Sequence, residues 1–224
     1  IRSMRGLRRH FRQLTFHVPL DADFDALAVP YRAVVTDFAT GDPVALSSGD
    51  LVQAMLASMA VPGAFQPREI DGALYVDGGM AAQLPVQMAQ AMGADIIIAI
   101  DTTVEPPAPT ASPSMADTLQ QLIRVSVWRN RQEDVARLDG DDLLLSPSLE
   151  GLSTTTFERA SRGVAAGEQE ARRHETRLRA IADLAAPRRT RDIARTHPAQ
   201  MADAELRVIN NTPLNDTLLS ARAN

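Results

Sequence analysis

The 224-residue sequence contains no cysteine and no lysine, so each of its 23 basic side chains is an arginine. Without cysteine, disulfide scaffolds, thiolate metal sites and cysteine nucleophiles are excluded. No apolar run reaches about 18 residues, the length that a membrane-spanning helix needs. No two histidines lie three to five residues apart, which argues against a helical zinc pair (His10, His17, His174 and His197).

Aromatic residues are also scarce, at 4% of the chain, and the net charge is -5. Residues 13–158 hold 6 arginines against 20 acidic residues, so the basic residues gather at the two ends. Proteins that read nucleic acids place aromatic side chains among their arginines. A genome that favours arginine codons, together with solvated helical faces, is the better explanation, and no nucleic-acid partner is expected. Neither glycine pattern of the common nucleotide-binding loops occurs.

What the sequence does contain is an alternation of short apolar strands and amphipathic helices. We expect strands at residues 31–36, 44–46, 68–70, 73–76, 96–100 and 142–146. We expect helices at residues 7–16, 51–59, 86–92, 115–138 and 155–186, with loops at 21–27 and 105–114. The run at 96–100 is uninterrupted, which is typical of a strand buried on both faces. The alternation predicts a three-layer α/β/α domain.

Local signals set several of these bounds. Ser47 and Asp50 form a capping-box pattern before the helix at 51–59, and Thr155–Glu158 forms another. Asp71-Gly72 is a strong hairpin signal, and Gly93 suits the position just after a helix.

The chain starts at Ile1 without a basic-then-apolar signal segment, so we expect it to be trimmed at its N-terminus.

Asp77 is the strongest candidate for a catalytic residue. It ends a short strand and is followed by Gly78 and Gly79, which let another backbone or a substrate approach closely. A carboxylate in that place can act as general base toward a hydroxyl nucleophile. From spacing alone, an ordinary Asp-Gly turn explains the motif more simply. Asp101, at the end of the following strand, is expected to be structural or to cap a helix or loop.

Four segments in order carry a more specific signal: VTDFATG, ALSSGDLVQAMLASMAVPGAFQP, LYVDGG and LPVQMAQAMGADIIIAID. Together they resemble the bacterial patatin-like phospholipases, and the resemblance continues through Leu143–Pro147 and Thr155–Ala186. It implies an α/β/α lipid acyl hydrolase with a Ser-Asp dyad and no cofactor or metal. The aspartate of the family's D-G-[GA] motif carries over to Asp77, with Gly78 and Gly79 shaping its turn.

The sequence departs from the family pattern at two places. Gln83 stands where the family often has asparagine before Leu-Pro, which changes local hydrogen bonding. The family's G-x-S-x-G nucleophile motif is absent, and the nearest glycine spacing, Gly163 to Gly167, has Ala165 at the serine position. We therefore expect the C-terminal part of a catalytic domain, inactive by itself, which in the parent protein hydrolyses phospholipid or other lipid esters. The alternative is a non-catalytic lipid-binding or interaction module.

The end of the chain shows a second resemblance. Residues 204–216 are similar to the opening of a POTRA repeat, although an ordinary strand-turn-helix extension explains them equally well. The expected organisation is a patatin-like portion at 1–186, a linker at 187–204 and the start of a POTRA-like module at 205–224. The POTRA interpretation implies an autotransporter with an outer-membrane barrel, at the cell surface or secreted; otherwise the protein is cytoplasmic. The arginines of 172–195 suit either a membrane surface or a solvated helix face.

Overall fold

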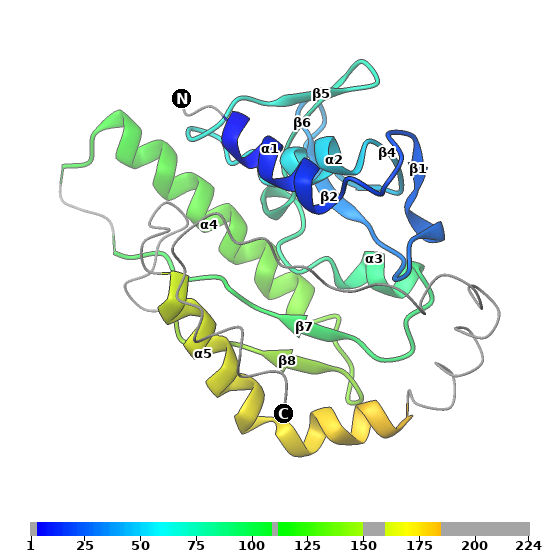
Figure 1. Ribbon diagram of the computed structural model, residues 1–224. Coiled ribbons are helices and arrows are strands. Elements are labelled where there is room, and N and C mark those ends of the chain that lie inside the picture. The colour runs from blue at the N-terminus through cyan, green and yellow to red at the C-terminus, as the bar shows by residue number, and fades with distance from the viewer. Residues whose placement is uncertain (1–3, 109–111, 150–159, 185–224) are drawn as a thin grey trace. The chain divides into compact units, whose positions relative to one another are not determined.

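A computed structural model of the chain describes residues 4–108, 112–149 and 160–184 (Figure 1). The chain divides into two compact units, Ile1–Arg177 and Leu178–Asn224. Of the second unit, residues 178–184 are described, and they are helical. The predicted capping box at Thr155–Glu158, the linker at 187–204 and the POTRA-like start at 205–224 lie outside the described residues. The outer-membrane location that depends on the POTRA-like start therefore stays a prediction.

The first unit mixes short strands with helices, so the predicted α/β class is confirmed. In chain order its elements are α1 (Arg5–Leu14), β1 (Ala22–Asp23), the 3-10 helix η1 (Phe24–Ala26), β2 (Ala33–Asp37), β3 (Pro43–Leu46), β4 (Ser48–Gly49), α2 (Leu51–Ser58), β5 (Arg68–Ile70), β6 (Ala73–Asp77), the 3-10 helix η2 (Gly78–Met80), α3 (Val86–Ala91), β7 (Ile98–Ile100), α4 (Met115–Val135), β8 (Leu143–Leu145) and α5 (Ala160–Arg173). Within the described residues, no helix combines the length and the apolar character needed to cross a membrane.

The largest sheet is antiparallel, with its four strands in the order β3-β2-β6-β5. Asp71 and Gly72 join β5 to β6 with φ angles of 52° and 83°. Two consecutive residues with positive φ are the mark of a type I′ turn, so the predicted hairpin is confirmed. The pairing of β2 with β6 places Asp77 opposite Val35, in the middle of the sheet.

Helix α2 packs against β2 and β6, and α1 packs against α2 (Figure 1). An apolar cluster joins α1 to α2: Val52, Leu56 and Ala60 are completely buried, and Met4, from the segment before α1, is 8% exposed. Burial of these side chains is the main source of stability for this part of the unit.

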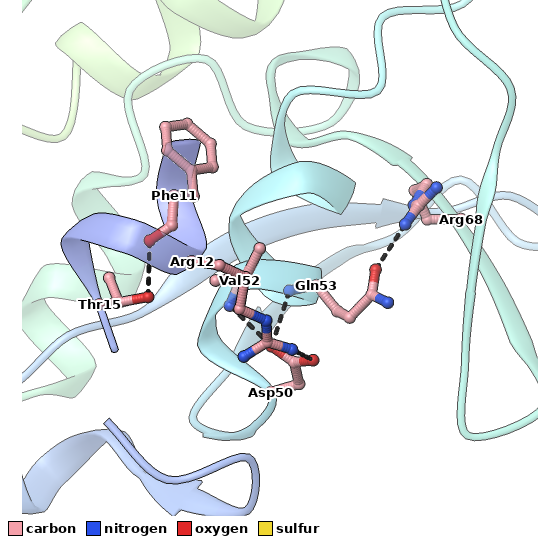
Figure 2. A network of polar contacts seen from close by, with 7 residues as sticks. All are labelled: Phe11, Arg12, Thr15, Asp50, Val52, Gln53 and Arg68. Atoms are coloured by element: carbon pink, nitrogen blue, oxygen red, sulfur yellow. Dashed lines mark hydrogen bonds and ion pairs between the residues drawn. The ribbon is translucent and has the colours of Figure 1, made fainter. Parts of the chain in front are cut away.

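The first turn of α2 is held by Asp50 (Figure 2). Its Oδ1 accepts the backbone N–H groups of Val52 at 2.9 Å and Gln53 at 3.2 Å, and its Oδ2 pairs with the guanidinium of Arg12 on α1. The predicted capping box from Ser47 to Asp50 is wrong, because residues 48 and 49 are extended as β4, which pairs with β1. The helix therefore begins at Leu51, with Asp50 as its N-cap.

Strands β7 and β8 form a separate parallel pair. Ala99 of β7 is buried in an apolar cluster with residues of α3. Leu144 of β8 and the end of α4 pack against this cluster. The expectation that the strand at 96–100 is buried on both faces is wrong, because Ile98 and Ile100 are 43% and 59% exposed. Within the described residues β7 pairs only with β8, so one of its edges carries no strand there.

The helix predicted for residues 155–186 is interrupted within its described part. α5 ends at Arg173, His174 forms a turn, and residues 175–184 are helical again. The N–H of His174 is shared between the carbonyl oxygens of Glu170 at 3.3 Å and Ala171 at 3.2 Å. Glu170 also ties α5 to the end of β8, because its Oε1 accepts the N–H of Ser146 at 3.1 Å.

We predict that Asp50→Ala lowers the free energy of unfolding by about 1–2 kcal/mol, because it removes the N-cap of α2 together with the partner of Arg12. Urea denaturation of the wild-type and variant chains measures this loss. Arg12→Met is the matched control, since it removes the partly exposed ion pair and keeps the cap; its cost is expected to stay below about 1 kcal/mol. Equal losses in the two variants would show that the cap is not the main contribution.

Candidate active site

The site is built around the end of strand β6. Asp77 is the last residue of the strand and the N-cap of η2, where its Oδ1 accepts the N–H of Gly79 at 2.8 Å. Its own N–H donates to the carbonyl of Ala60, and its carbonyl accepts the hydroxyl of buried Thr36 on β2 at 2.8 Å. Both backbone groups of Asp77, its N–H and its carbonyl, are therefore held by neighbouring segments.

The two glycines after Asp77 are required by close contacts rather than by their φ angles. A Cβ placed on Gly78 would overlap the carbonyl oxygen of Val34 in β2. A Cβ on Gly79 would overlap the side-chain oxygen of Gln83 and lie 3.1 Å from Asp77 Oδ1. The turn thus packs directly onto the backbone of β2, and the Gln83 amide lies close to the Asp77 carboxylate.

The carboxyl of Asp77 is partly buried, and this burial raises its pKa above the ordinary value. The N–H of Gly79 acts in the opposite direction, since it stabilises the ionised form, but its effect is smaller. A carboxylate whose pKa is raised in this way is a stronger base than a solvated one.

Helix α4 contributes two polar side chains that the sequence analysis did not single out. Asn130 donates from Nδ2 to the carbonyl of Met80 at 2.5 Å, and Asp134 accepts the N–H of Leu84 on Oδ2 at 2.9 Å. The spacing of apolar residues in α4 gives a sequence signal for these two positions. The apolar residues Ile123 and Val127 lie at helical spacing with positions 130 and 134, so polar residues there fall on the more buried face of the helix.

Asp101 has the structural role expected of it. It is 4% exposed, its Oδ1 accepts the N–H of Thr103 at 2.9 Å, and its Oδ2 accepts Nε of Arg131 at 2.7 Å. Both oxygens are therefore engaged in fixing the loop after β7 against α4. Searched over the described part of the chain, His, Asp and Glu nowhere gather into a group of three that could hold a metal ion.

Comparison with known proteins finds one matching family model and several relatives that align with part of the chain. Residues 6–89, which include Asp77, Gly78 and Gly79, match the family model described as patatin-like phospholipase. An uncharacterized NTE family protein of Mycobacterium tuberculosis is 37% identical over 103 residues, which cover 45% of this chain and 29% of that protein. The match therefore spans less than a third of the mycobacterial relative.

Two mammalian proteins match a similar stretch. Patatin-like phospholipase domain-containing protein 7 of Mus musculus is 36% identical over 83 residues, which are 36% of this chain and 6% of that protein. Patatin-like phospholipase domain-containing protein 6 of Homo sapiens is 34% identical over 93 residues, 41% of this chain and 7% of that protein.

Gly78→Ala is expected to destabilise the protein by about 1–3 kcal/mol, because the new methyl group meets the backbone of a central strand that cannot rotate away. Urea denaturation measures the effect. Gly140→Ala is the control, since a Cβ there meets nothing within 4 Å, and it should change stability by no more than about 0.5 kcal/mol. A Gly78→Ala variant as stable as the control would contradict the close packing of the turn on β2.

Asp77→Asn should be as stable as the wild type near pH 3 (about one unit below the ordinary carboxyl pKa) and more stable at pH 7. The reason is that a pKa raised by folding makes the ionised carboxylate costly, and this cost appears as the pH rises through the raised value. Asp117→Asn should behave oppositely, because hydrogen bonds from Ser114 lower the pKa of Asp117. Thermal unfolding across this pH range measures both, and a loss of stability in Asp77→Asn at pH 7 would contradict the electrostatic account.

Proposed function

We propose that the chain, whose residues 6–89 match the patatin-like phospholipase family model, is part of a lipid acyl hydrolase in which Asp77 is the general base. The substrates are phospholipids or other lipid esters, and the reaction passes through an acyl-enzyme. The observation that carries the proposal is the placement of Asp77: a partly buried carboxylate at the end of a central strand, fixed from both sides and inside the matched segment.

In this mechanism the carboxylate of Asp77 removes the proton of a serine hydroxyl as the serine oxygen attacks the ester carbonyl. Backbone N–H groups stabilise the tetrahedral oxyanion, and the protonated Asp77 returns the proton to the departing alcohol. A water molecule, deprotonated by the same carboxylate, then attacks the acyl-serine; the bond to the serine oxygen breaks, Asp77 returns the proton to that oxygen, and the fatty acid is released. No histidine is needed, because one carboxylate serves both half-reactions.

The serine itself would come from a G-x-S-x-G motif, and the 224 residues contain none. A base without a nucleophile has nothing to activate, so we propose that this chain alone does not hydrolyse esters. The same observation favours a second candidate, a lipid-binding or interaction module that keeps the fold without the reaction. The residues encoded upstream of Ile1 distinguish the two: a G-x-S-x-G after a strand supports the hydrolase, and its absence supports the module.

In the full-length parent protein, Asp77→Asn is expected to reduce hydrolysis of a phospholipid or short-chain ester by about 100-fold or more, the range for loss of a general base. Steady-state rates on a chromogenic ester and on phospholipid vesicles measure the loss. Asp37→Asn is the matched control, because Asp37 also ends a strand of the same sheet but caps its own turn through the N–H groups of Ala39 and Thr40. Wild-type turnover in Asp77→Asn would rule out the assignment.

A further inference from the structure

Two side chains of α4 hold the segment that follows the Asp77 turn. Asn130 and Asp134 lie one helical turn apart and therefore on the same face of α4. Asn130 contacts the carbonyl of Met80, the last residue of η2, and Asp134 contacts the N–H of Leu84. Together they fix both ends of residues 80–84.

The use of a buried carboxylate, Asp134, to hold residues 80–84 has a cost in free energy. It is 8% exposed, and burial raises the pKa of its carboxyl, although the N–H groups of Leu84 and Gln83 and the charge of Arg137 oppose the rise. Burying a carboxylate costs free energy, whereas burying an apolar residue at the same position would not. In exchange, the carboxylate accepts the backbone N–H of Leu84, which an apolar side chain cannot do.

Gln83 lies between these two contacts and connects the segment to the Asp77 turn. Gln83 precedes Leu84, and its side-chain oxygen lies against Gly79, close to the Oδ1 of Asp77. The N–H group that Asp134 accepts belongs to Leu84, the residue that directly follows Gln83. A change at Asp134 therefore reaches Asp77 through a short path: the backbone of residues 83 and 84, the Gln83 amide, and the turn at Gly79.

We propose that Asp134, assisted by Asn130, is a positioning residue for Asp77: it holds residues 80–84 so that Gln83 covers the Asp77 turn and keeps the carboxylate aimed and partly shielded from water. This inference rests on the proposed function. Asp134 does not itself meet the substrate; it acts on the geometry and the surroundings of the base.

A residue that only stabilises the fold would change the free energy of unfolding and leave the chemistry of the remaining folded molecules intact. A positioning residue changes kcat and the pH profile of the folded enzyme. Loosening residues 80–84 exposes Asp77 to water, which lowers its raised pKa toward the ordinary value and moves the acidic limb of kcat/KM to lower pH.

The test compares Asp134→Ala, Asp134→Asn and Asn130→Ala in the full-length parent. Asp142→Ala is the matched control, because Asp142 also accepts backbone N–H groups, those of Ile97 at 2.7 Å and Asp139 at 3.0 Å, in a different part of the unit. For each variant, kcat, KM and the pH profile are measured on a soluble ester, and the melting temperature is measured in parallel.

Asp134→Ala is expected to lower kcat by about 10- to 100-fold with KM within about twofold, and to move the acidic limb to lower pH, as expected for a displaced base. Asp134→Asn keeps one acceptor oxygen and should recover most of kcat. Asp142→Ala should lower the melting temperature and leave kcat and the limb unchanged. If Asp134→Ala fails to fold, Asn130→Ala decides, with a smaller fall in kcat and the same shift of the limb.

The inference is overturned if the folded Asp134 and Asn130 variants keep the wild-type kcat and pH profile, whatever their melting temperatures. Asp77→Asn in the same assay separates this result from failure of the proposed function. Loss of activity in Asp77→Asn together with unchanged Asp134 and Asn130 variants overturns the positioning role alone. Full activity in Asp77→Asn overturns the assignment of the base, and the positioning role with it.

Discussion

The close approach of Gly78 to the backbone of β2 is the contact on which the candidate site depends. It is made possible by the absence of a side chain at residue 78, and it brings the turn after β6 directly against the carbonyl of Val34. The hydroxyl of Thr36 then reaches the carbonyl of Asp77, and the N–H of Gly79 reaches its carboxylate. A larger residue at position 78 would push the turn away from β2, where the hydroxyl of Thr36 now reaches the carbonyl of Asp77.

From that contact outward, the surroundings of Asp77 come from segments far apart in the sequence. β2 supports the turn from one side, the segment after α2 supplies the carbonyl of Ala60, and α4 holds residues 80–84. Burial by these elements raises the pKa of Asp77, which suits a base that must take a proton from a hydroxyl. The same packing that stabilises the unit therefore also sets the chemistry proposed for the carboxylate.

Features with local causes could be predicted from the sequence, and features with distant causes could not. Asp71-Gly72 makes its turn because both residues accept positive φ, and the pattern of two residues is sufficient to predict it. Asp50 replaces Ser47 as the cap of α2 because β4 pairs with β1, more than twenty residues away. The exposure of Ile98 and Ile100 depends on which elements cover β7, which an apolar run does not reveal. The helical spacing in α4 can place Asp134 on the buried face, but it cannot indicate that Asp134 contacts Leu84, which lies 50 residues earlier in the chain.

The central claim, that Asp77 activates a serine nucleophile, is tested most directly by the rate of covalent labelling of the full-length protein with a fluorophosphonate. This reagent requires no substrate turnover and no product release. The account predicts that the wild-type protein is labelled on one serine within a G-x-S-x-G sequence, and that Asp77→Asn is labelled far more slowly at that serine. Labelling of the two proteins at equal rates would contradict it.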